Sequence, residues 1–238
     1  MPPFSKGSLW YQRTVRPVGL VGVVAVVCVV ASCGRPAPPP AASSTEPARA
    51  QAQIDPARIT RARGELPPGY EVGDVSGPAS PAAFWGFGPG WVADPQACGA
   101  LAGPAGDSTT TRGWSGSGPG GIVHAVVTGS PTAPVIFDPA TVADCGRWSV
   151  TSGNTTGTVD LVDAPAIDGA DTVGMATVAR TVVEGGTETT STASTFSAYL
   201  GDYLAFVTVV TDPGSPGPAL DRDFAAALLV KTVSALRG

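Results

Sequence analysis

The sequence predicts a single α+β domain, with a central antiparallel sheet flanked by short helices and a C-terminal helix. Segments rich in Val and Thr, which suit a pleated sheet, follow one another between 148 and 211. The hairpin turn signals Glu184-Gly185-Gly186 and Gly201-Asp202 separate the longest of them. After a Pro- and Gly-rich stretch at 213–218, apolar residues recur at helical spacing from about 219 to 236. Such a helix is expected to pack on one face of the sheet.

The other elements follow from local signals. Asp-Pro pairs at 55–56, 94–95 and 138–139 predict helix starts, because Asp caps a helix and Pro suits its first position. They predict a short helix after Pro56 and helices at 95–102 and 139–146. Strands are expected at 70–75, 122–128, 135–137, 148–151, 158–162, 172–183, 187–199 and 203–211. Residues 103–120 are rich in Gly, Ser and Thr, which predicts a long surface loop with a brief strand near 110–114.

The composition limits what the 238-residue chain can do. Charged residues make up 14% and the formal net charge is −5, so the chain lacks the basic surface of nucleic-acid-binding proteins. It has one His and four Cys, too few for a His-rich metal site or a densely cross-linked scaffold. We therefore expect no nucleic-acid partner, no metal and no cofactor.

The first 32 residues have the pattern of a secretory signal peptide. Lys6, Arg13 and Arg16 form a basic start, and an almost unbroken apolar run follows at 18–30. The alternative is a membrane-spanning anchor, which needs about 17–25 apolar residues. Because the run is shorter, we expect a cleaved signal peptide over 1–32.

Residues 30–33, Val-Ala-Ser-Cys, resemble a bacterial lipobox. That resemblance implies that Cys33 receives a diacylglycerol on its sulfur and becomes the new N-terminus. The Pro- and Ala-rich segment 33–53 cannot form a core, so it is expected to be a disordered tether. Acyl chains on Cys33 would hold a folded domain, 54–238, at the outer face of the cell membrane. The alternative is an ordinary signal peptide followed by an accidental Cys.

Two cysteines remain for the exported domain. Cys28 lies in the apolar run and leaves with the signal peptide, while Cys33 carries the lipid. Cys98 and Cys145 are then an even pair in an oxidising compartment, which predicts a disulfide. Each follows an Asp-Pro helix start, so each is expected to face inward from a short helix. The alternative is two buried free thiols.

Few residues suit catalysis. The single His, His124, lies in a predicted strand and shares a face with Ile122 and Val126, which favours a packed or edge-exposed side chain. No nucleotide-binding loop, hydrolase elbow, zinc-protease motif or calcium loop occurs. No pattern selects a carboxylate pair of the kind that hydrolyses glycosides. We therefore expect a protein that is not an enzyme.

Four acids lie close together in the sequence and are the nearest approach to a cation site. Their spacing matches no known calcium loop, so solvated acids in turns are expected. They are Asp160, Asp163, Asp168 and Asp171.

The most unusual segment lies at 84–91. It has four aromatic rings separated by Gly and Pro, which prevent a regular helix or strand. Such rings can line a groove for a sugar or an acyl ligand, which makes Trp85 and Trp91 the candidate ligand-binding residues. The alternative, which the sequence favours, is that the rings close one end of the core.

The order of these features resembles the mycobacterial lipoproteins related to the extracellular sensor domain of the kinase PknH. The resemblance covers about 54–238 and rests on the lipobox, the tether, the closing helix and the segments 66–70, 94–98 and 143–148. It implies a central antiparallel sheet flanked by helices, with a cleft proposed to bind an unknown ligand. In this resemblance, the sensor domain of the kinase carries two disulfides, whereas the domain expected here has only the pair Cys98 and Cys145. Two Lys against twelve Arg is typical of a GC-rich actinobacterium.

These features predict an exported, lipid-anchored cell-envelope protein with a non-catalytic, sensor-like domain. Its expected partners are the membrane, through the acyl chains on Cys33, and an unknown ligand or envelope protein. The alternatives are a cell-envelope hydrolase and a structural interaction lipoprotein without a small-molecule site. A dry cleft lined by Trp85 or Trp91 favours the first hypothesis, a converging carboxylate pair favours the hydrolase, and a flat exposed apolar patch favours the third.

Overall fold

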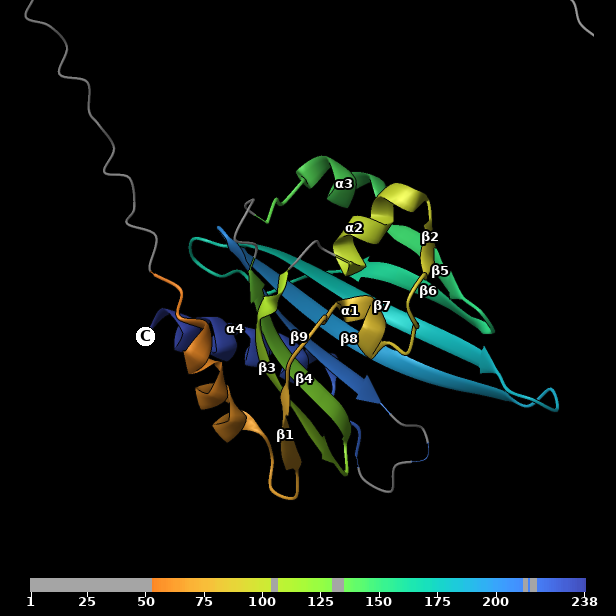
Figure 1. Cartoon of the computed structure of the whole chain (residues 1–238), viewed down its shortest axis with the longest axis horizontal. Coiled ribbons are helices and arrows are strands. Elements are labelled where there is room, and N and C mark those ends of the chain that lie inside the picture. The colour runs from red at the N-terminus through yellow and green to blue at the C-terminus, as the bar shows by residue number, and fades with distance from the viewer. Residues whose placement is uncertain (1–52, 104–106, 130–134, 212–213, 215–217) are drawn as a thin grey trace, which may run out of the picture. The chain divides into compact units, whose positions relative to one another are not determined.

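The protein is built around a sheet of nine antiparallel strands, seen in Figure 1. The strands are β1 (Glu71–Val75), β2 (Val92–Asp94), β3 (Asp107–Gly118), β4 (Gly121–Gly129), β5 (Arg147–Ser152), β6 (Thr155–Val162), β7 (Asp171–Val182), β8 (Glu188–Leu200) and β9 (Tyr203–Thr211). Across the sheet their order is β1-β3-β4-β9-β8-β7-β6-β5-β2.

The helices are short except for the last one. They are the 3-10 helices η1 (Pro56–Glu65) and η2 (Gln96–Cys98), and the α-helices α1 (Pro81–Phe84), α2 (Gly99–Ala102), α3 (Pro139–Asp144) and α4 (Arg222–Arg237). The predicted α+β fold class, with an antiparallel sheet and a C-terminal helix, is therefore confirmed.

This computed structural model describes residues 53–103, 107–129, 135–211, 214 and 218–238. The predicted signal peptide, Cys33 and all but the last residue of the predicted tether lie outside the described residues. Within the described ranges, no helix is both long enough and apolar enough to cross a membrane.

The β7–β8 hairpin sets the register of the longest strands. Its turn contains Gly185 and Gly186, whose φ angles of 90° and 80° lie in the left-handed region that only Gly adopts without strain. Pairing then runs from Val182 opposite Glu188 to Asp171 opposite Tyr199. The sequence predicted this hairpin at the same turn residues.

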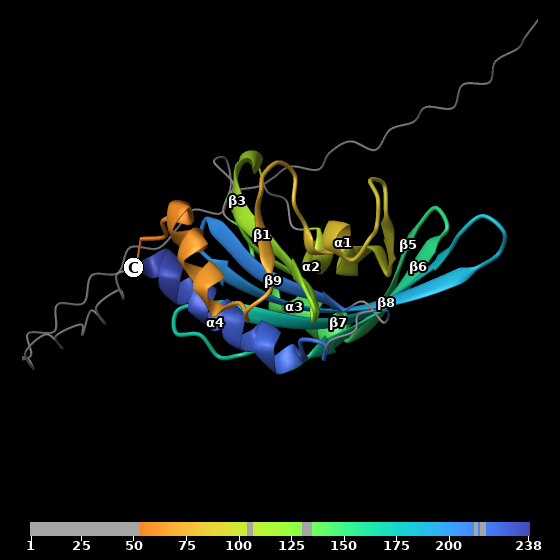
Figure 2. The same cartoon turned by 90° about the horizontal axis from the view of Figure 1, so that it is seen from below.

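Each face of the sheet covers its own hydrophobic core, because successive side chains of a strand point to opposite faces. On one face, α4 and η1 lie over the central strands, and α4 buries Leu228, Leu229, Val233 and Leu236. On the other face, Trp85, Trp148 and Met175 pack with the disulfide. In Figure 2 the sheet curves around α1 and α2, while α4 and η1 lie on its opposite side.

The largest correction to the sequence prediction concerns 103–120, which was expected to be a loop with a brief strand. In the structure, β3 occupies 107–118 and pairs with both β1 and β4. Its glycines give it a loop-like composition, but they have a packing role. A Cβ on Gly116 would lie 2.7 Å from Leu66 Cδ1, and one on Gly118 would lie 2.7 Å from the Tyr70 ring. Gly in a strand interior often marks such a close approach.

Smaller differences occur at the short elements. Residues 135–137, expected as a strand, are in no strand. The helix expected at 95–102 is the 3-10 helix η2 followed by α2, and the one expected at 139–146 ends at Asp144. The predicted Asp caps are present at two of the three helix starts, where Asp55 and Asp138 accept the backbone N–H groups of Ala57 and Ala140.

Candidate functional site

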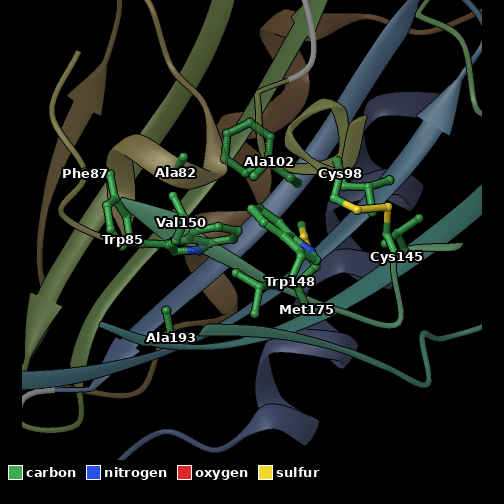
Figure 3. Close-up of a cluster of buried hydrophobic side chains, with 14 of the residues drawn as sticks. Ala82, Trp85, Phe87, Cys98, Ala102, Cys145, Trp148, Val150, Met175 and Ala193 are labelled. Atoms are coloured by element: carbon green, nitrogen blue, oxygen red, sulfur yellow. A yellow bond between two sulfur atoms is a disulfide. The ribbon is translucent and has the colours of Figure 1, made fainter. Parts of the chain in front are cut away.

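Cys98 and Cys145 form the predicted disulfide, with the two sulfur atoms 2.01 Å apart. The bond joins the end of η2 to the residue that follows α3. Both cysteines are buried, and Figure 3 shows Trp148 and Met175 close to them. The disulfide is thus a structural cross-link within one of the two cores, and its burial protects it from reducing agents in solution.

Trp85 does not lie on a binding surface in this structure. It is 2% exposed, and its ring packs 6.2 Å from that of Trp148, centre to centre (Figure 3). Its indole N–H donates to the Thr195 hydroxyl at 2.9 Å, and this hydroxyl also contacts that of Thr208 at 2.9 Å. Trp85 is therefore a core residue in this structure, which is the alternative that the sequence favoured.

Trp91 is half-buried and lies against the backbone of α2. A Cβ on Gly103 would lie only 2.6 Å from its ring atom Cζ2, and one on Gly99 would lie 3.4 Å from the same ring. The two glycines thus form a flat seat for the ring. Part of Trp91 stays exposed to solvent, so its role in ligand binding remains a prediction.

His124 lies half-buried on β4, an inner strand between β3 and β9. Its ring stacks on Phe84 of α1, with ring centres 4.0 Å apart and an interplanar angle of 23°. Its Nδ1 is buried, and no described residue forms a hydrogen bond with it. Burial lowers the pKa of His124 from 6.5 to about 4, because a charged imidazolium would lose its hydration there.

This burial predicts a loss of stability in mild acid. The pKa of His124 is lower in the folded than in the unfolded chain, so the unfolded chain takes up the proton first as the pH falls. The contribution of neutral His124 to the free energy of unfolding is fully present above pH 6.5 and is lost progressively down to about pH 4. Allowing for partial exposure, we expect a loss of about 2 kcal/mol, measured by urea unfolding at a series of pH values.

The variant His124→Phe is the matched control, because it keeps a ring against Phe84 but cannot titrate. Other groups titrate in the same interval, so the informative quantity is the difference between the two pH profiles. We expect the profile of the variant to be flatter between pH 6.5 and 4. Identical profiles for the two proteins would show that His124 titrates normally in the fold.

The structure has a pocket of about 560 Å³ at one end of the sheet. It is open to solvent and is lined by aromatic, small and acidic residues. These are Val135, Phe137, Gly169, Ala170, Asp171, Tyr199 and Gly201. Neither Trp85 nor Trp91 lines it, so the sequence did not predict this site.

Strand register brings the polar part of the pocket together. Asp171 begins β7, and Tyr199 lies directly opposite it on β8, so the two side chains point to the same face. The Phe137 ring meets the Tyr199 ring at 5.3 Å in an edge-to-face arrangement. Tyr199 is 8% exposed, and burial raises the pKa of its hydroxyl, which therefore stays protonated at neutral pH.

Three contacts hold the loop that forms another wall of the pocket. The Arg237 guanidinium, at the end of α4, donates to the carbonyl oxygens of Asp168 and Gly169 at 2.6 and 3.1 Å. The Thr172 hydroxyl donates to the carbonyl oxygen of Pro165 at 2.9 Å. Gly169 and Ala170 are thus fixed in place before any ligand arrives, as in preformed small-molecule sites.

The pocket residues come from three separated parts of the sequence, and no motif marks them. The hairpin register is the one signal that leads to the site, because counting outward from Gly185, with Val182 opposite Glu188, places Asp171 opposite Tyr199. The sequence predicts a solvated turn acid at Asp171; the side chain is exposed, and the residue begins β7. Among the described residues, no group of three or more His, Cys, Asp and Glu side chains is arranged to hold a metal ion.

These features define a disulfide-linked α+β domain with a pocket at one end of its sheet. The chain belongs to the family described as Domain of unknown function (DUF5642), which matches residues 55–237. No curated protein matches the chain.

Solved structures that are similar to this chain include two mycobacterial proteins. One is an uncharacterised protein of Mycobacterium smegmatis, an ortholog of Rv0999, with a TM-score of 0.58, 24% identity and coverage of 79% of this chain and 100% of that chain. The other is the extracellular domain of PknH from Mycobacterium tuberculosis, with a TM-score of 0.38, 12% identity and coverage of 77% and 93%. The family match and the fold shared with the Mycobacterium smegmatis protein confirm the resemblance predicted from the sequence.

Proposed function

We propose that the protein is an exported cell-envelope lipoprotein whose domain binds a ligand without catalysing a reaction. Acyl chains on Cys33 anchor it at the outer face of the membrane, and the tether separates the domain from the lipid. The observation that carries the binding function is the pocket at the end of the sheet, with its fixed walls and its few polar groups.

The disulfide supports an extracytoplasmic location. Disulfides form and persist in oxidising compartments and are rare in the cytosol. Cys98 and Cys145 are each 1% exposed, so their bond is part of the folded core rather than an exchangeable surface pair. The lipobox ending at Cys33 agrees with the same location.

A non-catalytic role agrees with the chemistry near the pocket. Asp171 is the one acid among its lining residues, whereas glycoside hydrolysis uses a pair of carboxyl groups. His124, the single His of the chain, is packed against Phe84, and its lowered pKa makes it a weak base. Both points favour binding over the hydrolase alternative.

The anchoring part of the proposal is tested by the substitution Cys33→Ala in the full chain. We expect the variant to be unprocessed or soluble, because the sulfur that carries the diacylglycerol is gone and the signal peptidase of lipoproteins no longer has its substrate. Membrane fractionation and mass spectrometry of the N-terminus measure both effects.

The chain offers a matched control in Cys28→Ala. This substitution also removes a thiol near the expected cleavage site, but Cys28 lies in the apolar run of the signal peptide. We expect it to leave processing and membrane association unchanged. If Cys33→Ala is still cleaved after Ser32 and still partitions with membranes, lipidation at Cys33 is wrong.

A further inference from the structure

The residues that line the pocket also indicate the class of its ligand, and this inference rests on the proposed binding function. We propose that the pocket binds a pyranose sugar, with two neighbouring hydroxyl groups donating to the Asp171 carboxylate and the apolar face of the sugar against an aromatic ring of the wall. Charge, hydrogen-bonding capacity and ring geometry each favour this class.

The charge of the pocket disfavours anions. Asp171 contributes a negative charge, and no Lys, Arg or His is among the lining residues. The guanidinium of Arg237, which holds the loop of the pocket wall, already donates to the carbonyl oxygens of Asp168 and Gly169. A phosphate or carboxylate ligand would therefore meet a like charge without a compensating partner.

The polar groups match hydroxyl donors. An ionised carboxylate only accepts hydrogen bonds and has two oxygens, so Asp171 can accept from two adjacent hydroxyl groups at once. No salt bridge within the described part of the chain uses Asp171. Tyr199 adds a neutral hydroxyl, which can donate and accept. Sugars present this mixture of donors and acceptors.

The arrangement of the rings separates a sugar from an organic cation. Cations are bound over the faces of aromatic rings, with several rings forming a cage in the tightest sites. Here the Phe137 and Tyr199 rings are 5.3 Å apart and inclined by 65°, so they pack on each other instead of enclosing a space between parallel walls. The half-buried Phe137 ring is a single aromatic surface, which suits the flat apolar side of a pyranose better than a cage-bound cation.

The small residues give the ligand room. Gly169, Ala170 and Gly201 form walls with little or no side chain beside the two rings. The volume of about 560 Å³ lies within the range of small-molecule sites. A single sugar unit, or two linked units, fits such a space.

The test uses the protein as its cells export it, in a polyoxyethylene detergent that carries neither a sugar nor a cation. The probes are the methyl α-pyranosides of D-glucose, D-mannose and D-galactose, measured by saturation-transfer NMR. Cyclohexanol serves as a ring without neighbouring hydroxyl groups, and tetramethylammonium serves as a cation. We expect saturable binding of at least one glycoside and none of cyclohexanol.

Substitutions then locate the binding. Asp171→Asn keeps the size of the side chain and removes its charge, and we expect it to weaken glycoside binding about tenfold or more. Phe137→Ala should also weaken binding, through the lost ring surface. Asp163→Asn is the matched control, because Asp163 is an exposed acid of the same loop region that does not line the pocket, so its affinity should not change.

The outcomes separate the two levels of the proposal. If no glycoside binds, or if Asp171→Asn binds as tightly as the parent, the sugar assignment is overturned. Tetramethylammonium binding that requires Asp171 would reject the sugar class but keep the binding function. Native mass spectrometry of the exported protein decides the remaining case: a bound non-sugar molecule rejects only the sugar, and the absence of any bound species together with no probe binding rejects both.

Discussion

Trp85→Ala is expected to destabilise the domain by about 3–5 kcal/mol, the usual cost of truncating a buried Trp. The ring is 2% exposed and packs beside Trp148, so its removal leaves a cavity in one core. The Thr195 hydroxyl loses the indole donor but keeps its contact with Thr208, which limits the polar part of the cost. Urea unfolding of both proteins at pH 7 measures the difference.

Two further substitutions separate the core role from the binding role. Trp85→Phe keeps most of the ring and removes the N–H donor, so we expect a loss of about 1–2 kcal/mol. Trp91→Ala, at a half-buried ring seated on Gly99 and Gly103, should cost less than Trp85→Ala. A loss below about 1 kcal/mol for Trp85→Ala would contradict burial of the ring and restore Trp85 as a candidate for a binding surface.

The parts of the fold that the sequence predicted are those with a strong local signal. The turn at Gly185 and Gly186 has one conformation that glycine alone adopts freely, so it specified the hairpin and its position. The apolar repeat of α4 specified a helix that buries one side. In both cases the information lies within a few residues, and tertiary packing strengthens a preference that is already present.

The strand β3 shows where local signals end. Its glycines weaken its intrinsic preference for a strand, and by composition it resembles a loop. What keeps the strand in place is distant in sequence, because Leu66 and Tyr70 fold over Gly116 and Gly118 with no room for a Cβ. The sequence shows the glycines of β3, but it does not show which distant side chains require them.

The candidate site shows the same limit. Residues 85–91 are irregular as predicted, although Phe84 belongs to helix α1. Burial depends on which elements cover a ring, and no local sequence pattern indicates this. The pocket residues Phe137, Asp171 and Tyr199 become neighbours only through the register of β7 and β8 and the position of the segment before α3. Register can be counted from a hairpin turn, whereas the placement of that segment cannot.

Removal of the disulfide by the double substitution Cys98→Ala and Cys145→Ala is expected to lower stability by about 4 kcal/mol. The cysteines are 47 positions apart, and closing a loop of that length restricts the unfolded chain by this amount in the entropic account of disulfides. Unfolding in urea should show the loss against the oxidised parent, and dithiothreitol under unfolding conditions should weaken the parent but not the variant. Peptide mapping without reduction should find the linked pair in the parent.

The loss should also have a local part near the pocket. None of the six residues of α3 is buried, so the bond at Cys145 is a main attachment of this helix to the domain. Asp138 caps α3 directly after Phe137, and a loosened helix would therefore move a ring of the pocket wall. We expect hydrogen exchange in the double variant to increase most at 137–145, while the amides of β8 and β9 stay the best protected. Free thiols at both positions in freshly exported parent, or a double variant as stable as the oxidised parent, would show that the cross-link does not hold this end of the sheet together.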